Sequence, residues 1–258
     1  MELRAQLQDC VGELDGLERS LERSLGVMRG KLEAAINVQR RYEADAAHEL
    51  RTPVAGLRAQ LEEAQLNRAE IDLDSLLERA LSDVNRLQAI IEDLHLLCEL
   101  QEAARLVEPV PVDLAEVARA QVPRCAGRHE VKVKAEPGLV VSSVPARLGR
   151  LLAELLDNAQ RHARFLVRVE IRRAGDLGEL VVSDDGPGIP AHERERVFGR
   201  FTRLDDARCR DRGGTGLGLA IVRNIAEMYG GSVHAEEAAG GGAALVVRLP
   251  LAHPAAPG

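Results

Sequence analysis

Apolar positions recur at a seven-residue interval along the first part of the chain. One such seam consists of Leu7, Leu14, Leu21, Met28 and Ala35. A seven-residue repeat with glutamate and arginine between the seams is typical of a coiled coil, and a shift in a second seam resembles a stutter. The pattern predicts a coiled-coil signalling helix over residues 1–35, although an amphipathic helix packed on its own domain would show the same stripe.

The helical pattern continues to about Asn67, and a polar turn over residues 67–74 precedes a second helix over residues 75–104. One broad face of this second helix is formed by Leu76, Leu77, Leu81, Val84, Leu87, Ile91, Leu94 and Leu97. Two long helices joined by a short turn predict a helical hairpin. Because one hairpin buries little apolar surface, we expect a homodimer in which two hairpins form a four-helix bundle.

The pattern changes at residues 107–112, where two prolines in three residues end the helix and predict a linker. Beyond it, helices expected at 148–162 and 217–229 alternate with strands expected near 131–133, 166–171, 180–183, 232–235 and 244–249. A charged, glycine-rich loop over 185–214 interrupts them. The fold class is therefore α followed by α/β. Residues 113–251 should form an α/β sandwich with a mixed, mostly antiparallel sheet, and residues 252–258 a disordered tail.

Composition excludes several function classes. The chain has 258 residues, of which 45% are hydrophobic and 29% charged, as in globular proteins with two domains. Aromatic residues make up only 2% and the formal net charge is -7, so we expect no nucleic-acid binding. No apolar run approaches the roughly 18 residues that span a membrane, and the four cysteines lack metal-site or disulfide spacing. We expect a cytoplasmic protein with no membrane contact except through a segment upstream of this chain.

One histidine in the first long helix has neighbours suited to nucleophilic chemistry. His48 lies among charged residues in the segment Ala44–Pro53, so we expect it to be exposed. A neutral imidazole is a competent nucleophile near neutral pH, and the Glu49 carboxylate can orient it and take its proton. Thr52 follows four residues later on the same helical face, and Pro53 predicts a kink. Taken alone, the His-Glu pair is also compatible with an ordinary solvated helix surface.

The segment around His48 closely resembles the phosphoacceptor box of sensor histidine kinases of bacterial two-component systems. Four later segments resemble the nucleotide-binding boxes of the same family in the same order: residues 155–162, 184–189, 197–201 and 213–220. The resemblance covers about residues 36–251, and five ordered boxes are far more specific than any single motif. It implies a dimerisation and phosphotransfer domain over 36–106 and a catalytic ATP-binding domain over 113–251.

The resemblance implies that ATP phosphorylates His48 and that the phosphoryl group then passes to an aspartate of a response regulator. It gives Glu49 the role of base and orienter, and Thr52 a role in dephosphorylating the regulator. His95, which lies among the leucines of the second helix, is expected to be a bundle residue and not a second acceptor. Family members are often membrane sensors, so the chain resembles the cytoplasmic part of an inner-membrane sensor. Two alternatives remain: a degenerate kinase that acts as an ATP-binding regulatory module, or a gyrase- or MutL-type ATPase.

The resemblance also assigns the ATP site. It places Mg²⁺ on Asn158 and the adenine amino group on the Asp184 carboxylate, while glycines at the start of a helix suit phosphate. The full implied set is Glu154, Asn158, Arg161, His162, Asp184, Gly186, Gly188, Ile189, Phe201, Gly214, Thr215, Gly216, Leu217 and Gly218. Glu154 departs from the family pattern, since many members have a second asparagine there. The Glu-x-x-x-Asn spacing also occurs in the gyrase- and MutL-type ATPases, whose glutamate activates water, and Glu154 could instead be a second Mg²⁺ ligand.

Overall fold

The structure is a computed structural model. It describes residues 28–30, 44, 46–67, 72–102, 108–125, 127, 129–202, 204 and 214–252. The chain divides into two compact units, Met1–Arg51 and Thr52–Gly258. Of the predicted coiled coil only residues 28–30 are described, and they are helical. The rest of that prediction, and nearly all of the predicted tail, lie outside the described residues.

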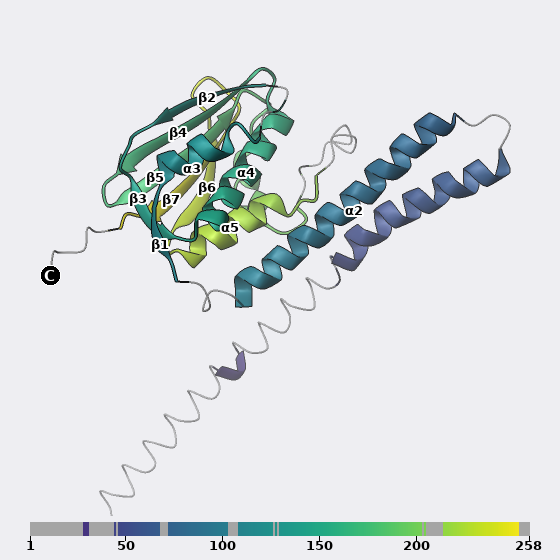
Figure 1. The fold of residues 1–258 in the computed structure, drawn as a ribbon, viewed down its shortest axis with the longest axis horizontal. Helices are drawn as coiled ribbons and strands as arrows, with labels where there is room; N and C mark the ends of the chain where they lie inside the picture. Colours follow the sequence, from purple (N-terminus) through teal and green to yellow (C-terminus); the bar gives the residue numbers. More distant parts are fainter. Residues whose placement is uncertain are drawn as a thin grey trace, which may run out of the picture. The chain divides into compact units, whose positions relative to one another are not determined.

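The predicted helical hairpin is present. Its first helix covers residues 46–66 and continues through Pro53, and its second helix, α2, runs over Leu73–Glu102 (Figure 1). Gln60 Nε2 donates to Asp83 Oδ2 at 3.1 Å, which ties the two helices together. No helix within the described ranges is long and apolar enough to cross a membrane.

The α/β part is built on a five-stranded sheet of order β2-β4-β5-β7-β6. Its strands are β2 (Glu130–Ala135), β4 (Leu166–Ala174), β5 (Leu177–Asp184), β6 (Ser232–Glu237) and β7 (Ala243–Pro250). Only the β2–β4 pair is parallel, and the other neighbours are antiparallel. The predicted mixed, mostly antiparallel sheet is therefore confirmed.

Three helices lie across one face of this sheet: α3 (Leu114–Gln121), α4 (Pro145–His162) and α5 (Gly218–Met228) (Figure 1). Apolar residues recur every three or four positions along α4 and bury one stripe, consisting of Leu148, Leu151, Leu152, Leu155, Leu156 and Ala159. Each buried leucine contributes about 1.5–3 kcal/mol, so this stripe fixes α4 against the sheet. The polar face of α4 is consequently held at the surface, where a ligand can reach it.

Part of the predicted linker belongs to the α/β domain. Strand β1 (Val110–Asp113) begins inside the predicted linker over 107–112 and pairs with β3 (Val140–Ser143) in a separate two-stranded sheet. A proline is tolerated in a strand that pairs on one side only, which explains how Pro111 fits. Asp113 then caps α3, because its Oδ1 accepts the Ala115 N–H at 2.7 Å.

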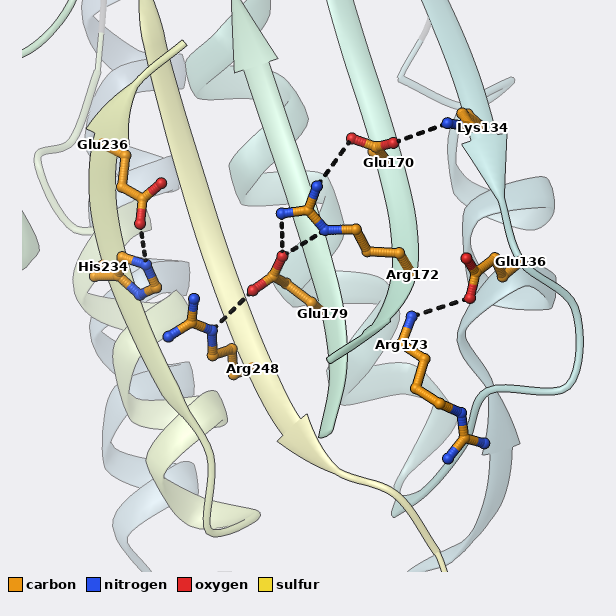
Figure 2. Close-up of polar contacts among 9 residues, drawn as sticks. All are labelled: Lys134, Glu136, Glu170, Arg172, Arg173, Glu179, His234, Glu236 and Arg248. Carbon is orange, nitrogen blue, oxygen red and sulfur yellow. Dashed lines mark hydrogen bonds and ion pairs between the residues drawn. The ribbon is translucent and has the colours of Figure 1, made fainter. Parts of the chain in front are cut away.

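The other face of the five-stranded sheet carries a ladder of charged side chains that crosses four strands (Figure 2). Lys134 Nζ lies 3.3 Å from Glu170, and Glu170 lies 3.7 Å from Arg172. Glu179 sits at the centre with only 3% of its side chain exposed, between Arg172 Nη2 at 2.5 Å and Arg248 Nε at 2.8 Å. Burial acts to raise the pKa of the Glu179 carboxyl, but hydrogen bonds from Arg248 and Arg172 outweigh it and lower the pKa.

Replacing Glu179 by glutamine should lower the free energy of unfolding at pH 7 by about 1–3 kcal/mol, because the variant leaves two guanidinium groups facing a neutral amide. The folded-state pKa of Glu179 lies below its unfolded value. The contribution of ionised Glu179 to the free energy of unfolding is therefore complete above about pH 4.3. It is lost as the pH falls through the folded-state pKa. Urea titrations of wild type and E179Q should diverge at pH 7 and converge in acid. E170Q, on the exposed end of the ladder, is the control and should change stability little; equal losses for both variants would contradict the central role of Glu179.

Candidate functional site

A cavity of about 1180 Å³ lies in the second unit, where α4, the end of β5 and the start of α5 meet. Most of the predicted nucleotide-binding residues line it: Glu154, Asn158, Arg161, His162, Asp184, Gly188, Ile189, Gly214, Thr215, Gly216 and Gly218. Three predicted residues do not line it. Leu217 is completely buried in the core. Gly186 and Phe201 lie next to residues that line the cavity, namely Asp184 and Gly216. Residues as far apart in the sequence as Glu154 and Gly218 thus line the same cavity.

Asp184 is a buried acidic residue in the lining of the cavity. It is the last residue of β5 and only 3% exposed. Its Oδ1 accepts the Gly186 N–H at 2.8 Å and the Ala243 N–H at 3.4 Å. Burial raises the pKa of the Asp184 carboxyl, while the two backbone hydrogen bonds act to lower it. These two donors fix the orientation of the carboxylate through Oδ1, so Oδ2 takes part in neither bond.

The first glycine segment follows Asp184 directly and needs a residue without a side chain at Gly186. A Cβ there would collide with the backbone carbonyl of His162 and would lie 2.7 Å from Asp184 Oδ1. Only glycine therefore allows the chain to turn against the end of α4 and still donate to Asp184. The adjacent Asp185 accepts the N–H groups of Arg164, Phe165 and Leu166, mainly that of Phe165, and these bonds lower its pKa to about 2.

The polar face of α4 forms one wall of the cavity. Glu154, Asn158 and Arg161 follow at spacings of four and three residues, so their side chains share a face. Arg161 forms an ion pair with Asp157, and Glu154 lies 2.6 Å from Arg150 Nη2. The wall therefore offers an amide and a guanidinium group together with two carboxylates.

Glu154 is the most perturbed of these groups. Burial, together with the negative charges of Asp93 and Asp157, raises its pKa to about 7, although Arg150 acts in the opposite direction. A carboxyl group near half-ionisation at neutral pH can hold or release a proton, or bind a cation once deprotonated.

The second glycine segment forms the opposite wall and leads into α5. Gly216 has φ +72, a conformation that L side chains rarely adopt, and a Cβ there would lie 2.9 Å from the Phe201 Cα. The Thr215 hydroxyl accepts the Leu217 N–H at 3.2 Å. A tight turn that lines the cavity thus leads into α5, and the N-terminus of a helix is a position that favours anions.

The predicted glycine-rich loop over 185–214 contains two short 3-10 helices, η2 (Ala191–Glu193) and η3 (Arg196–Phe198). Phe198 is 2% exposed and anchors η3 in the core. Phe201 has φ +55 and is the single residue other than glycine with a positive φ in the described part of the chain. Phe198 thus fixes η3 in the core, and the backbone of Phe201 lies close to Gly216 in the turn before α5.

The cavity fits a magnesium ion that is bound mainly by a nucleotide. Within the described residues no three acidic, histidine or cysteine side chains cluster as a metal site. Mg²⁺ instead favours one or two protein oxygens together with phosphate oxygens and waters. The Asn158 amide oxygen and the Glu154 carboxylate, one helical turn apart on the cavity wall, supply such a pair.

The predicted phosphoacceptor segment lies at the end of the first unit and the start of the second. His48 is exposed on the helix, as expected, and Glu49 is half-buried beside it. Thr52 is exposed at the first residue of the second unit. An exposed imidazole is accessible to a reagent from solution, which a nucleophile requires.

Several residues at the cavity were not predicted from the sequence. Ala243 supplies a backbone N–H to Asp184, and the run of three glycines before it was the available signal. Asp93 and Arg150 also line the cavity. Asp93 has no local sequence signal, because its partners lie far away in the sequence.

Comparison with known proteins agrees with this arrangement. Residues 38–102 match the His Kinase A (phospho-acceptor) domain, and residues 143–253 match the family described as Histidine kinase-, DNA gyrase B-, and HSP90-like ATPase. The sensor protein RstB of Escherichia coli strain K12 is 36% identical over 232 residues, covering 88% of this chain and 52% of RstB. The histidine-protein kinase AfsQ2 of Streptomyces coelicolor is 33% identical over 257 residues, covering 95% of this chain and 47% of AfsQ2. The chain thus spans about half the length of these relatives.

Solved structures of histidine kinases have a similar fold. The histidine kinase AdeS of Acinetobacter baumannii shares the fold, with a TM-score of 0.59 at 23% identity over 80% of this chain and 98% of AdeS. Full-length ShkA in complex with AMPPNP is 27% identical with a TM-score of 0.57, covering 81% of this chain and 45% of ShkA. With both domain matches in order and named sensor kinases among its relatives, the chain belongs to the sensor histidine kinases of bacterial two-component systems.

Proposed function

We propose that this chain is the part of a sensor kinase that phosphorylates itself on His48 from ATP and passes the phosphoryl group to an aspartate of a response regulator. The observation that carries the proposal is the single cavity that gathers Asp184, Asn158 and the start of α5. The phosphoacceptor-domain match and the names of the relatives favour a kinase over a gyrase-type ATPase or a degenerate regulatory module. Residues 36–106 would form the phosphotransfer domain and residues 113–251, extended by β1, the ATP-binding domain.

ATP is proposed to enter with its base against Asp184 and its phosphates against the start of α5. The oriented Asp184 carboxylate accepts the adenine amino group, and the N–H groups near Gly216 and Gly218 bind phosphate oxygens. Arg161 supplies positive charge from α4. Bound Mg²⁺, held by Asn158 and Glu154, would neutralise phosphate charge. Positioning and charge neutralisation supply most of the rate enhancement in phosphoryl transfer.

The chemical step is proposed to occur at the His48 imidazole. Its unprotonated ring nitrogen attacks the γ-phosphorus, an N–P bond forms, and the bond to the bridging oxygen of ADP breaks. Glu49 accepts the proton of the other ring nitrogen, which leaves a neutral phosphoimidazole. The phosphoryl group then moves to a carboxylate oxygen of the regulator, and His48 is regenerated. Because ATP is supplied in the cytoplasm, we place this portion of the kinase there.

Reversal by ADP tests this function without a known regulator. The chain loaded with label from γ-labelled ATP should lose that label to ADP, which reforms labelled ATP, because an N–P bond has high transfer potential. A degenerate module would take up no label. Label that enters the chain but cannot return to ADP would contradict a phosphohistidine.

We further propose that two copies of the chain dimerise through the hairpin. Apolar side chains remain exposed on the hairpin, namely Val54, Leu61, Leu66, Leu73, Leu77, Leu81, Val84 and Ile91. Such a stripe on paired helices is too apolar to remain in water, and a second hairpin would cover it in a four-helix bundle.

Substituting Leu81 by glutamate should therefore convert a dimer to a monomer at micromolar concentration, because two charges would be buried in the bundle. Sedimentation velocity measures the change. The control is V133E, at an exposed apolar residue of β2 outside the hairpin, which should remain a dimer. A wild-type chain that sediments as a folded monomer would contradict the proposal.

Thr52 is proposed to position the water that dephosphorylates the regulator. Its exposed hydroxyl can donate and accept, which alanine and valine cannot. T52A should keep much of the autophosphorylation of His48 but lose about 5- to 150-fold in phosphatase rate, equivalent to roughly 1–3 kcal/mol. Release of phosphate from the phosphorylated regulator measures this rate. T52V preserves the shape of the side chain, so full phosphatase activity in that variant would end the assignment.

A further inference from the structure

Asp93 is a buried acidic residue in the middle of α2. Its side chain is 6% exposed, whereas the neighbouring residues Ile91 and Glu92 are exposed. A buried carboxylate is costly unless hydrogen bonds and opposite charge compensate it. Its position therefore depends on specific partners.

Both partners of Asp93 belong to the α/β domain. Arg150 Nη2, on α4, lies 2.5 Å from Asp93 Oδ1, and the Thr215 hydroxyl, at the start of α5, donates to Asp93 Oδ2 at 2.7 Å. The two carboxylate oxygens thus contact helix α4 and the turn that precedes α5. This divided contact ties α2 to both walls of the cavity.

Each partner also has a second contact that points to the proposed phosphate site. Thr215 Oγ1 accepts the Leu217 N–H at 3.2 Å, so it shapes the turn that would face the phosphates. Arg150 lies 2.6 Å from Glu154, one turn before Asn158. Asp93 therefore holds a hydroxyl and a guanidinium group that border the place where phosphate would bind.

The charge around Asp93 conflicts with a triphosphate. Glu92 and Asp157 add negative charge to its surroundings and Arg150 adds positive charge, while burial contributes most to raising its pKa. Bringing phosphate oxygens to the start of α5 would place further negative charge close to the Asp93 carboxylate. The Arg150 guanidinium can compensate only part of this charge, because it is already shared with Glu154.

We propose that Asp93 docks α2 onto the nucleotide site and that this contact competes with binding of a nucleoside triphosphate. The inference rests on the proposed function only for the identity of the ligand. In the docked state the carboxylate engages Thr215 and Arg150. When phosphates occupy the start of α5, the contact opens and α2 separates from this wall. The binding energy of the nucleotide is then used in part to free the ATP-binding domain from the helix.

The affinity for Mg·AMPPNP tests the competition in the full-length chain. D93N removes the charge at nearly constant shape and should bind about 5- to 50-fold more tightly than wild type by calorimetry, a range typical of coupling between sites. D93A, which removes both hydrogen bonds where the amide of D93N can still accept one, should bind at least as tightly as D93N. The control is D83N, because Asp83 lines the same cavity from α2 but contacts Gln60 within the hairpin. Equal affinities of wild type and D93N, or an equal gain in D83N, would overturn the inference.

Hydrogen exchange without nucleotide tests the docking contact separately. Amides of residues 214–219 should exchange about 3- to 10-fold faster in D93N than in wild type, the change expected for one net hydrogen bond, and D83N should match wild type. Adding Mg·AMPPNP to wild type should speed exchange in residues 88–97 of α2. Unchanged exchange in D93N would show that the docking contact is wrong even if nucleotide binds. If no variant binds AMPPNP, the proposed nucleotide site fails and the competition fails with it, whereas exchange in D93N still decides the docking contact.

Discussion

Replacing His48 by glutamine is expected to abolish transfer of the γ-phosphoryl group of ATP onto the chain and to leave ATP binding unchanged. Glutamine occupies similar space on the exposed helix, but its amide nitrogen is not a nucleophile. The nucleotide cavity is formed by residues of the second unit, so the substitution should not alter its affinity. Acid-labile label from γ-labelled ATP measures transfer, and calorimetry with Mg·AMPPNP measures binding.

His95 offers a matched control on the other helix of the hairpin. It too is exposed, with 75% of its side chain accessible, and its Nδ1 lies 3.4 Å from Glu99. H95Q should label like the wild type. Label that persists in H48Q and disappears in H95Q would reverse the assignment of the acceptor.

Replacing Asp184 by asparagine is expected to weaken ATP binding by about 10- to 150-fold, the equivalent of roughly 1.5–3 kcal/mol for a hydrogen bond to a charged group. The carboxylate lines the cavity and is held through Oδ1 by the N–H groups of Gly186 and Ala243, so its orientation is fixed before a ligand binds. An amide would present its NH₂ either to these donors or to the adenine amino group, and each choice sets donor against donor. Calorimetric titration with Mg·AMPPNP checks the loss.

D185N is the control for this second prediction. Asp185 undergoes the same chemical change at the next position, but its carboxylate accepts N–H groups of the turn at Arg164, Phe165 and Leu166 and does not line the cavity. We expect lower thermal stability in D185N with an ATP affinity within about threefold of wild type, since the bonds lost are remote from the ligand. An equal loss of affinity in both variants would indicate a general disturbance of the loop and would contradict a direct contact of Asp184 with adenine.

Elements with a strong hydrophobic period were predictable from sequence. The second helix of the hairpin was expected over 75–104 and is observed over Leu73–Glu102, because its leucines mark one face over many turns. The strands β4 and β5 were expected from alternation and from an apolar run, and both are longer in the structure. An element that buries one face has apolar residues at a regular interval in the sequence. This periodicity predicts the element even when the segment that packs against it is not known.

Elements whose stability comes from pairing were not predictable. β1 has only four residues and contains Pro111, and this pattern predicts a linker after the end of a helix. It is a strand because β3 supplies its hydrogen bonds, and β3 lies almost 30 residues away in sequence. The helix α3 is also short, with eight residues, and its start is capped by Asp113. Short elements carry too few residues for a period to stand out.

The candidate site shows the same division. The residues of the glycine segments and of α4 carry local motifs, and most of them line one cavity. Leu217 belongs to the same motif but lies in the core, because the motif also specifies how α5 packs. Asp93 has no motif, since its bonds to Arg150 and Thr215 cross 57 and 122 residues of sequence. Such long-range polar contacts follow from the folded arrangement alone.

The destination of the γ-phosphoryl group decides whether this chain is a kinase that phosphorylates His48 or an ATP hydrolase. The chain is incubated with γ-labelled ATP and Mg²⁺, label on the protein is compared with free phosphate, and the labelled peptide is mapped. We expect an acid-labile label in the peptide that contains His48, with little free phosphate. Free phosphate without labelled protein would identify a hydrolase that uses Glu154, and label on any other peptide would show that His48 is not the acceptor.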